Sequence, residues 1–349
     1  MDVVVEWLDP NRGDEAEFAG FHEVRSAADA VDLPGEEPTT YESTAGRLRN
    51  PFPGFGDVRH WLARRDGEVV ATATLLFPER ENDRLALAEI TVHPKSRRQG
   101  IGTAVLRALA PEMAARGRDV VEGAMVTKGG AGEAWATALG FRTVNETILQ
   151  WLRFAEVDRS LWDVPVPVGY RVERWVGVAP EEFIASYAEA KCAIRDAPRG
   201  EAALQEREWT VDRVREDEVS AVGRGIEARV VVAVHEATGA VVGLTQLWLQ
   251  PRRRPWGFQQ DTAVLAAHRG HGLGRAIKAA MLRWLVSDGP DLVLVRTGTN
   301  ADNVHMARVN HALGFTTVRS MVEVNRTVAG LEALGGVDAE QRQAEDQRP

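Results

Sequence analysis

One glycine-rich loop occurs twice in this chain, and this repeat constrains the fold more than any other feature. The first copy reads Arg97-Arg98-Gln99-Gly100-Ile101-Gly102 and the second reads Arg269-Gly270-His271-Gly272-Leu273-Gly274. Each copy follows a β-branched strand end and precedes a segment rich in Ala and Leu, a pattern that predicts strand, loop and helix in that order. The first N–H groups of such a helix have no partner within it, so they suit a phosphate. The sequence therefore predicts a duplicated fold with a phosphate-bearing ligand.

Other landmarks repeat at nearly the same distance. Arg97 and Arg269 are 172 residues apart, and so are Val69 and Val241. The two Leu-Gly-Phe segments are 174 residues apart. A nearly constant offset predicts two copies of one unit of about 150–170 residues, which is an ordinary domain size.

Composition excludes several classes of protein. The chain has 349 residues and a net charge of −9, whereas nucleic-acid binding relies on clustered Lys and Arg. Cys192 is the only cysteine, so no disulfide framework or thiolate zinc site is expected. No apolar run reaches the roughly 18 residues of a membrane span, and the N-terminal residues do not resemble a signal peptide. We therefore expect a cytoplasmic protein that binds neither nucleic acid nor membrane.

Hydrophobic periodicity predicts the same element order in both halves. A strand leads into helical segments, and a hairpin follows; in the first half its turn is Asp66-Gly67, a strong two-residue hairpin signal. A further strand then runs into the glycine-rich loop and a long helix, and a strand, a helix and a last strand complete the unit. This order predicts an α/β fold in which each half is a twisted mixed sheet flanked by helices.

The predicted domain boundaries follow the chain. The first domain covers 1–155 and the second covers 170–327. A proline-containing linker, 156–169, lies between them, and a polar tail, 328–349, is expected to be disordered.

The motifs resemble those of the GNAT superfamily of acyl-CoA-dependent N-acyltransferases, of which tandem members are known from actinobacteria. The superfamily signature is Gln/Arg-x-x-Gly-x-Gly/Ala after the fourth strand, and a Leu-Gly-Phe segment follows later. Both loops match it, beginning at Arg97 and Arg269. The resemblance covers about 1–155 and 168–327, and it implies acetyl-CoA, or another short acyl-CoA, as the cofactor.

The resemblance also implies which residues hold the cofactor. Backbone N–H groups of the two loops would bind the diphosphate, and the strand ends before them would run beside the pantetheine. Two asparagines after the next strand of the second half match the superfamily's polar contacts to CoA. The implied residues are Val92, Arg97, Arg98, Gln99, Gly100, Ile101, Gly102 and Thr103 in the first half, and Thr262, Val264, Arg269, Gly270, His271, Gly272, Leu273, Gly274, Arg275, Asn300 and Asn303 in the second.

Catalytic residues depart from the superfamily pattern. The usual fourth-strand Glu is absent, and the nearest acids, Glu89 and Asp261, each stand three residues before the strand-end Val. Strand alternation turns these acids to the other face unless a β-bulge resets the phase. Each is a candidate general base, with a carboxylate bound to a neighbouring loop as the alternative. The tyrosine that often protonates the leaving thiolate falls on Ala136 and Asn310, so Asn310 is the residue proposed at that place.

The second half keeps more of the pattern, because the first half has no Asn after the corresponding strand. We therefore expect the second half to transfer an acyl group to the amine of a small molecule in a ternary complex. The first half is expected to be structural or to bind CoA without turnover. A non-catalytic acyl-CoA sensor and transfer from aminoacyl-tRNA remain alternatives, the latter disfavoured by the acidic charge. The chain is expected to be a monomer or a homodimer.

No metal site is expected. His268 and His271 flank the second loop without a helical His-x-x-x-His pattern or an acidic partner. Positions facing solvent or adjacent to a phosphate fit them better.

Overall fold

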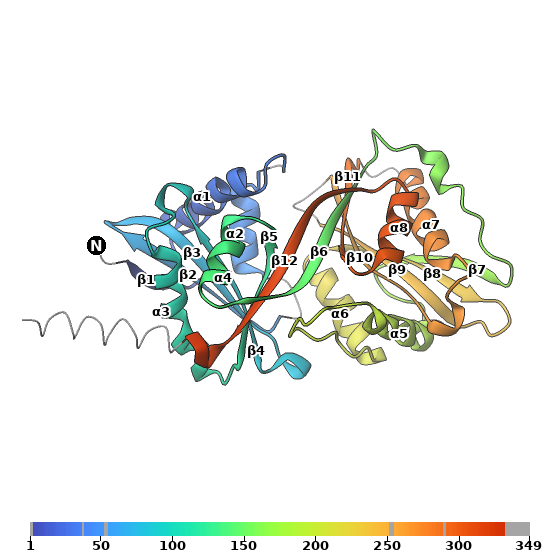
Figure 1. The fold of residues 1–349 in the computed structure, drawn as a ribbon. Coiled ribbons are helices and arrows are strands. Elements are labelled where there is room, and N and C mark those ends of the chain that lie inside the picture. The colour runs from blue at the N-terminus through green and yellow to red at the C-terminus, as the bar shows by residue number, and fades with distance from the viewer. Residues whose placement is uncertain (1–2, 37, 52–54, 251–254, 289–290, 332–349) are drawn as a thin grey trace, which may run out of the picture. The chain divides into compact units, whose positions relative to one another are not determined.

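The computed structural model describes residues 3–36, 38–51, 55–250, 255–288 and 291–331 (Figure 1). The chain folds into two compact units. The first unit takes in the residues up to 145, together with 201–205 and the residues from 322 onward. The second unit takes in 146–200 and 206–321.

The first unit is a mixed sheet with helices on both faces. Strands β1 to β4 are antiparallel to their neighbours, β4 and β5 are parallel, and β12 lies beside β5. Its elements are β1 (Val4–Leu8), α1 (Glu15–Asp32), α2 (Tyr41–Arg49), β2 (Asp57–Arg65), β3 (Glu68–Phe77), the 3-10 turn η1 (Arg80–Asn82), β4 (Leu85–Val92), η2 (Pro94–Ser96), α3 (Ile101–Ala115), β5 (Val120–Thr127), α4 (Ala131–Ala138) and the start of β6 (Arg142–Arg153).

Local sequence explains where these elements begin and turn. Asp14 caps α1 through a reciprocal capping box with Glu17, and Thr40 caps α2. Asp66 and Gly67 both have positive φ, as a tight hairpin turn requires. The apolar face of α3 packs on one side of the sheet with α4, and Phe18 and Phe21 of α1 belong to a separate cluster.

The second unit repeats this plan. Strands β7 to β10 are antiparallel to their neighbours, β10 and β11 are parallel, and β11 pairs antiparallel with β6. Its further elements are η3 (Arg159–Trp162), β7 (Tyr170–Val176), α5 (Ile184–Cys192), η4 (Ala193–Asp196), α6 (Val211–Gly223), β8 (Glu227–His235), β9 (Val241–Leu249), β10 (Trp256–Val264), η5 (Ala266–His268), α7 (Leu273–Ser287), β11 (Leu294–Asn300), α8 (Val304–Ala312) and β12 (Thr316–Thr327).

Two apolar clusters again fill the two faces of the sheet. Helix α7 supplies much of one cluster, and α5 supplies much of the other, with Trp175 and Tyr187 in contact there. The strands between them read as nearly continuous apolar runs, and Val230 to Val234 are all buried. The predicted fold class, two α/β repeats with mixed sheets, is confirmed.

The last strands are exchanged between the repeats. Residues 147–153 of β6, the last strand of the first sequence repeat, pair with β11 of the second unit. The end of β12, from Val322 onward, belongs to the first unit, where Val322 and Val324 join its core. The structure therefore draws the boundary differently from the predicted ranges 1–155 and 170–327, which follow the order of the chain.

Segments predicted as linker and tail also contribute to packing. Within 156–169, Trp162 is 2% exposed, and its indole N–H donates to the Leu313 carbonyl at 2.9 Å. Val328 and Leu331 are buried in the first core, and the rest of the predicted tail, 332–349, lies outside the described residues. No helix among the described residues combines the length and apolar character that a membrane crossing requires.

Candidate functional site

Both glycine-rich loops have the backbone shape that the motif predicts. Gly100 and Gly272 precede α3 and α7 with φ of 78° and 81°. A Cβ at either position would meet no atom within 4 Å, so backbone conformation rather than space requires glycine there. The helices begin at the next residue, and their first N–H groups have no partner within the helix. Each loop therefore offers donors and a positive helix end to an anion.

The arginine at the head of each loop fixes the loop to its own unit. Arg269 donates from Nε to the Val264 carbonyl at 2.9 Å and from its guanidinium to Asp196 at 2.5 Å. Arg97 makes the same contact with Val92, at 3.2 Å, and binds Asp32 through two nitrogens at 2.8 and 2.6 Å. These side chains hold the loop between a strand end and a helical segment, and the backbone N–H groups that follow them stay the predicted donors to the CoA diphosphate.

The strand before each loop separates from its parallel neighbour. In the second unit, β10 and β11 pair only over 256–258 and 294–296, and in the first unit β4 and β5 pair only over 85–87 and 120–122. Beyond those pairs the strands open toward the loop. The side of β10 that no longer pairs with β11 runs past Thr262 and Val264, and an extended ligand that carries amides could pair with a strand edge of this kind. This opening and the loop fit a ligand with an extended arm joined to a diphosphate, as in acyl-CoA.

A β-bulge distinguishes the two candidate bases. The register between β9 and β10 shifts between Gln259 and Thr262, which places Asp261 in the irregular segment. The register between β3 and β4 is continuous across Glu89. The bulge that is needed to turn the acid to the other face of the strand is therefore present in the second unit and absent at the corresponding place in the first.

Asp261 lies among acidic and aromatic groups. It acts electrostatically on Tyr187, Glu206 and Asp217, and no ion pair within the described ranges involves it. Burial raises the pKa of Tyr187, and the negative charges around it, Asp261 first among them, raise that pKa further. Asp261 therefore adds negative charge to the surroundings of Tyr187.

Two of these acids already have basic partners. Burial raises the pKa of Glu206 and of Asp217, and nearby basic groups partly oppose the rise. Glu206 pairs with Arg199, and Asp217 lies 3.6 Å from Arg207. Asp261 is thus the carboxylate of this group that is left without a counterion among the described residues.

A buried lysine completes this corner of the second unit. Lys191 of α5 is 2% exposed, donates to Gln246 at 3.2 Å and lies 3.9 Å from the centre of the Trp209 ring. A cavity of about 10 Å³, room for a single water, is lined by Tyr187, Lys191, Asp217 and Gln246 among others. Sequence reasoning missed Tyr187 and Lys191, although their spacing of four residues puts both on one helix face.

The first unit pairs its candidate base with a basic side chain from a neighbouring helix. The Arg25 guanidinium of α1 is bonded directly to the Glu89 carboxylate. Burial raises the pKa of Glu89, but Arg25 and Arg47 together outweigh it and hold the pKa below its ordinary value. His60 lies in the same group, and burial lowers its pKa to about 4, so it is neutral. Glu89 therefore already has the cationic partner that Asp261 lacks.

The two asparagines predicted to contact CoA in the second half accept hydrogen bonds from nearby backbone N–H groups. The side chain of Asn300 accepts from the Asp302 N–H at 2.7 Å, and Asn303 caps α8 by accepting from the Met306 N–H at 3.1 Å. These contacts use the amide oxygens, so contact of Asn300 or Asn303 with CoA stays a prediction.

Asn310, proposed at the place of the superfamily's tyrosine, is fully buried. Its amide nitrogen donates to Gln150 at 2.8 Å and to Thr299 at 3.2 Å. Such a position fits a structural role inside the unit better than proton transfer to a leaving group. Among the described residues no group of three or more His, Cys, Asp or Glu side chains has a metal-binding arrangement.

Comparison with known proteins agrees with this geometry. The Acetyltransferase (GNAT) family matches residues 27–141 and 194–315, one region in each repeat. The chain belongs to the GNAT acetyltransferase family. It is an acetyltransferase that uses acetyl-CoA, and acyl transfer from CoA is the activity its relatives share.

Particular relatives show how far the likeness extends. A mycothiol acetyltransferase of Nocardia farcinica is 29% identical over 90% of this chain and 95% of its own length. Another from Parafrankia is 29% identical over 91% and 97%. A tandem GNAT protein from the clavulanic acid biosynthesis pathway has a TM-score of 0.76 and 27% identity, over 94% of this chain and 99% of that one. The tandem arrangement is therefore shared along nearly the whole chain.

Proposed function

We propose that the second unit transfers the acetyl group to the amine of a small molecule, with Asp261 as the base, and that the first unit binds CoA without turnover. The observation that carries this proposal is the contrast between two acids 172 residues apart. Glu89 is bonded to Arg25, whereas Asp261 has no ion-pair partner among the described residues.

An unpaired carboxylate suits an amine acceptor. Glu206 and Asp217 lie near Asp261 but have basic partners of their own, so the Asp261 carboxylate is the group that would attract a protonated amine. Asp261, directly or through a water molecule, would accept the ammonium proton as the nitrogen attacks. Backbone N–H groups at the end of β10, near Thr262 to Val264, would stabilise the developing oxyanion.

Proton delivery to the leaving group is not required of the protein. Acetyl-CoA supplies a thioester, and a thiol with pKa about 8.5 can leave as the thiolate. This is consistent with Ala136 and the buried Asn310 at the place where other members have tyrosine. In this proposal the amine attacks the thioester directly, with both substrates bound and no covalent enzyme intermediate.

The test compares Asp261→Asn with Glu89→Gln in the full chain. Acetyl transfer is measured across a panel of small amines that includes the acceptor of the mycothiol acetyltransferases. We expect Asp261→Asn to lower kcat by about 100-fold to 10,000-fold with little change in acetyl-CoA affinity. Glu89→Gln should lower kcat by less than about tenfold. The opposite order would place catalysis in the first unit, and loss of binding without loss of kcat would remove the base assignment.

A further inference from the structure

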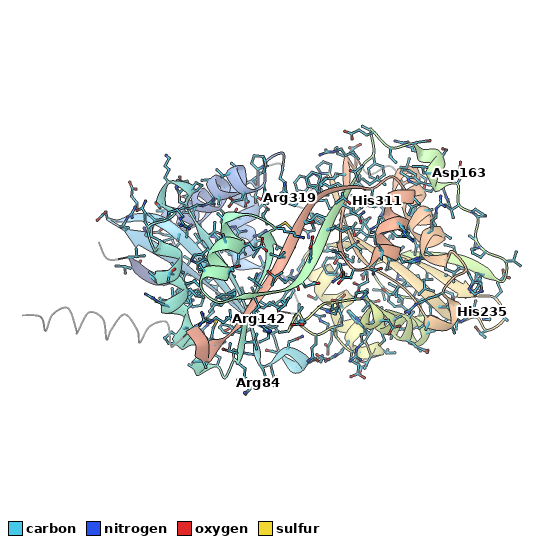
Figure 2. All side chains as sticks on the ribbon, in the orientation of Figure 1. Arg84, Arg142, Asp163, His235, His311 and Arg319 are labelled. Atoms are coloured by element: carbon cyan, nitrogen blue, oxygen red, sulfur yellow. The ribbon has the colours of Figure 1, made fainter. Side chains whose placement is uncertain are left out.

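Three histidines and a tyrosine gather beside the second glycine-rich loop. The hydroxyl oxygen of Tyr170, on β7, lies 3.0 Å from Nδ1 of His268. The His235 and His268 rings are 5.1 Å apart between centres, and the centre of the Tyr170 ring is 5.5 to 5.9 Å from the centres of all three imidazoles, including His271. Figure 2 labels His235, which ends β8 beside the turn that leads to β9. We call these four residues the His-Tyr cluster.

The cluster is built on the loop itself. His268 immediately precedes Arg269, and His271 stands between Gly270 and Gly272, both of which have positive φ. The carbonyl of His268 lies 3.3 Å from Nδ1 of His271. A change in the charge of these rings therefore changes the electrostatic potential at the N–H groups that open α7.

The first unit has a permanently charged side chain at one of the matching places. His235 ends its hairpin strand as Arg65 does in the first unit, and an offset of 172 places Gln99 opposite His271. Arg65 donates to the Gln99 side chain. The first loop thus has a guanidinium beside it, which stays charged at any ordinary pH, whereas the second has imidazoles, the side-chain type that can gain or lose a proton in the physiological range.

Among the described residues, no ion pair involves His235, His268 or His271. Thr238 lies 3.1 Å from Nδ1 of His235, and the nearby Asp196 carboxylate is already bonded to Arg269. Burial lowers the pKa of His268, and His235 and His271 lower it further. The positive charge of a protonated cluster is therefore uncompensated until an anion arrives.

We propose that the His-Tyr cluster is a phosphate-recognition element of the second cofactor loop that takes up protons when the phosphates of CoA bind. This inference rests on the proposed function, because it needs CoA at the second loop. A bound phosphate would favour the imidazolium forms, and each proton taken up makes the association constant change tenfold per pH unit. The first loop would show no such dependence.

The experiment measures binding rather than turnover. Isothermal titration with CoA and with 3′-dephospho-CoA is run between pH 5.5 and 8.0 on two full-length proteins. Both carry Gly100→Asp, since Asp tolerates positive φ and its charge repels phosphate at the first loop. One of them also carries His235→Gln, His268→Gln and His271→Gln. Circular dichroism confirms that both are folded, and NMR follows the histidine titrations with and without ligand.

The protein with histidines should bind CoA at least tenfold more tightly than the glutamine variant at pH 5.5, and within about twofold of it at pH 8.0. At least one histidine pKa should rise by about one unit on binding. If the histidines tighten the binding of CoA and of 3′-dephospho-CoA equally, the contact is with the diphosphate. If they tighten the binding of CoA alone, the contact is with the 3′-phosphate.

Two results would overturn the inference. Matching pH profiles for the two proteins, with unshifted histidine titrations, would overturn it while leaving cofactor binding intact. Failure of the parent protein to bind CoA at every pH would overturn the assignment of the second loop as well.

Discussion

The amide nitrogen of Asn310 is 2.8 Å from the side-chain oxygen of Gln150, a residue that precedes it by 160 positions in the chain. The contact is fully buried and fastens α8 to β6, the strand that the second unit takes from the end of the first sequence repeat. Asn310 thus has a structural task at the place where related enzymes have a catalytic tyrosine.

Asn310→Ala should therefore destabilise the chain without a specific loss of chemistry. The variant removes the Asn310 donor from Gln150 and Thr299, which keep only the 3.4 Å contact between them, and this loss costs about 1–3 kcal/mol. Chemical denaturation should show this loss, and kcat measured well below the melting temperature should fall less than about tenfold. His311→Ala, on the exposed side of the same helix, is the control. A 100-fold fall in kcat at unchanged stability would instead give Asn310 a chemical role.

Lys278 of α7 predicts a pH dependence of stability. The side chain is 2% exposed, and burial lowers its pKa to about 7. The unfolded chain keeps this proton to about pH 10.4, so between about pH 7 and 10 the unfolded state binds more protons and stability rises with pH.

Lys278→Met should remove that rise. The variant should be more stable than the parent at pH 7 by a few kcal/mol, since each unit of pKa shift corresponds to about 1.4 kcal/mol. The difference should shrink as the pH rises toward about 10.4, where the unfolded lysine begins to lose its proton as well. Urea unfolding at several pH values checks this. A constant difference from pH 7 to 10 would show that the buried lysine does not titrate in this range.

The two loop glycines offer a matched pair of substitutions. Gly272→Asp places a carboxylate among the N–H groups that open α7, and Gly100→Asp does the same at α3. We expect Gly272→Asp to raise the KM for acetyl-CoA more than tenfold. Gly100→Asp should reduce the number of CoA molecules bound and preserve kcat. Steady-state kinetics combined with titration calorimetry distinguishes them, and a reversed pattern would move catalysis to the first unit.

Arg25 and Glu89 should be coupled in stability at neutral pH only. Arg25 contributes to lowering the pKa of Glu89, so the stabilisation is present above the unfolded pKa of about 4.3 and is lost as the pH falls through the folded value. A double-mutant cycle with Arg25→Gln and Glu89→Gln should show coupling at pH 7 that fades below about pH 4. Coupling of the same size at pH 3 would mean that packing, not charge, joins the two side chains.

Much of the fold could be predicted from the sequence because its signals are local. Strand β4 and the helices after both loops begin and end within a residue or two of where periodicity and glycine place them. The short helices α2 and α6 escape such a prediction, although Thr40 and Thr210 cap them. Each lies in a polar stretch whose apolar positions are too few to stand out.

The rest depends on contacts between distant residues. The bonding of Glu89 to Arg25 and the surroundings of Asp261 depend on which helix covers which strand, and spacing along the chain does not encode that. The bulge at Asp261 can be inferred as a possibility, but no residue pattern specifies it. The sequence also does not indicate the strand exchange, because β6 and β12 each have the pattern of an ordinary last strand of their own repeat.

The exchanged strands set how these repeats can be recombined. A chimera joined inside 156–169 keeps each sequence repeat whole. Its two units would nevertheless each contain a last strand, β6 or β12, that comes from the other parent protein. Chimeras of tandem acetyltransferases should therefore tolerate such junctions only when β6 and β12 come from the same parent as the sheets that they complete. The two repeats of such a protein are then expected to evolve together.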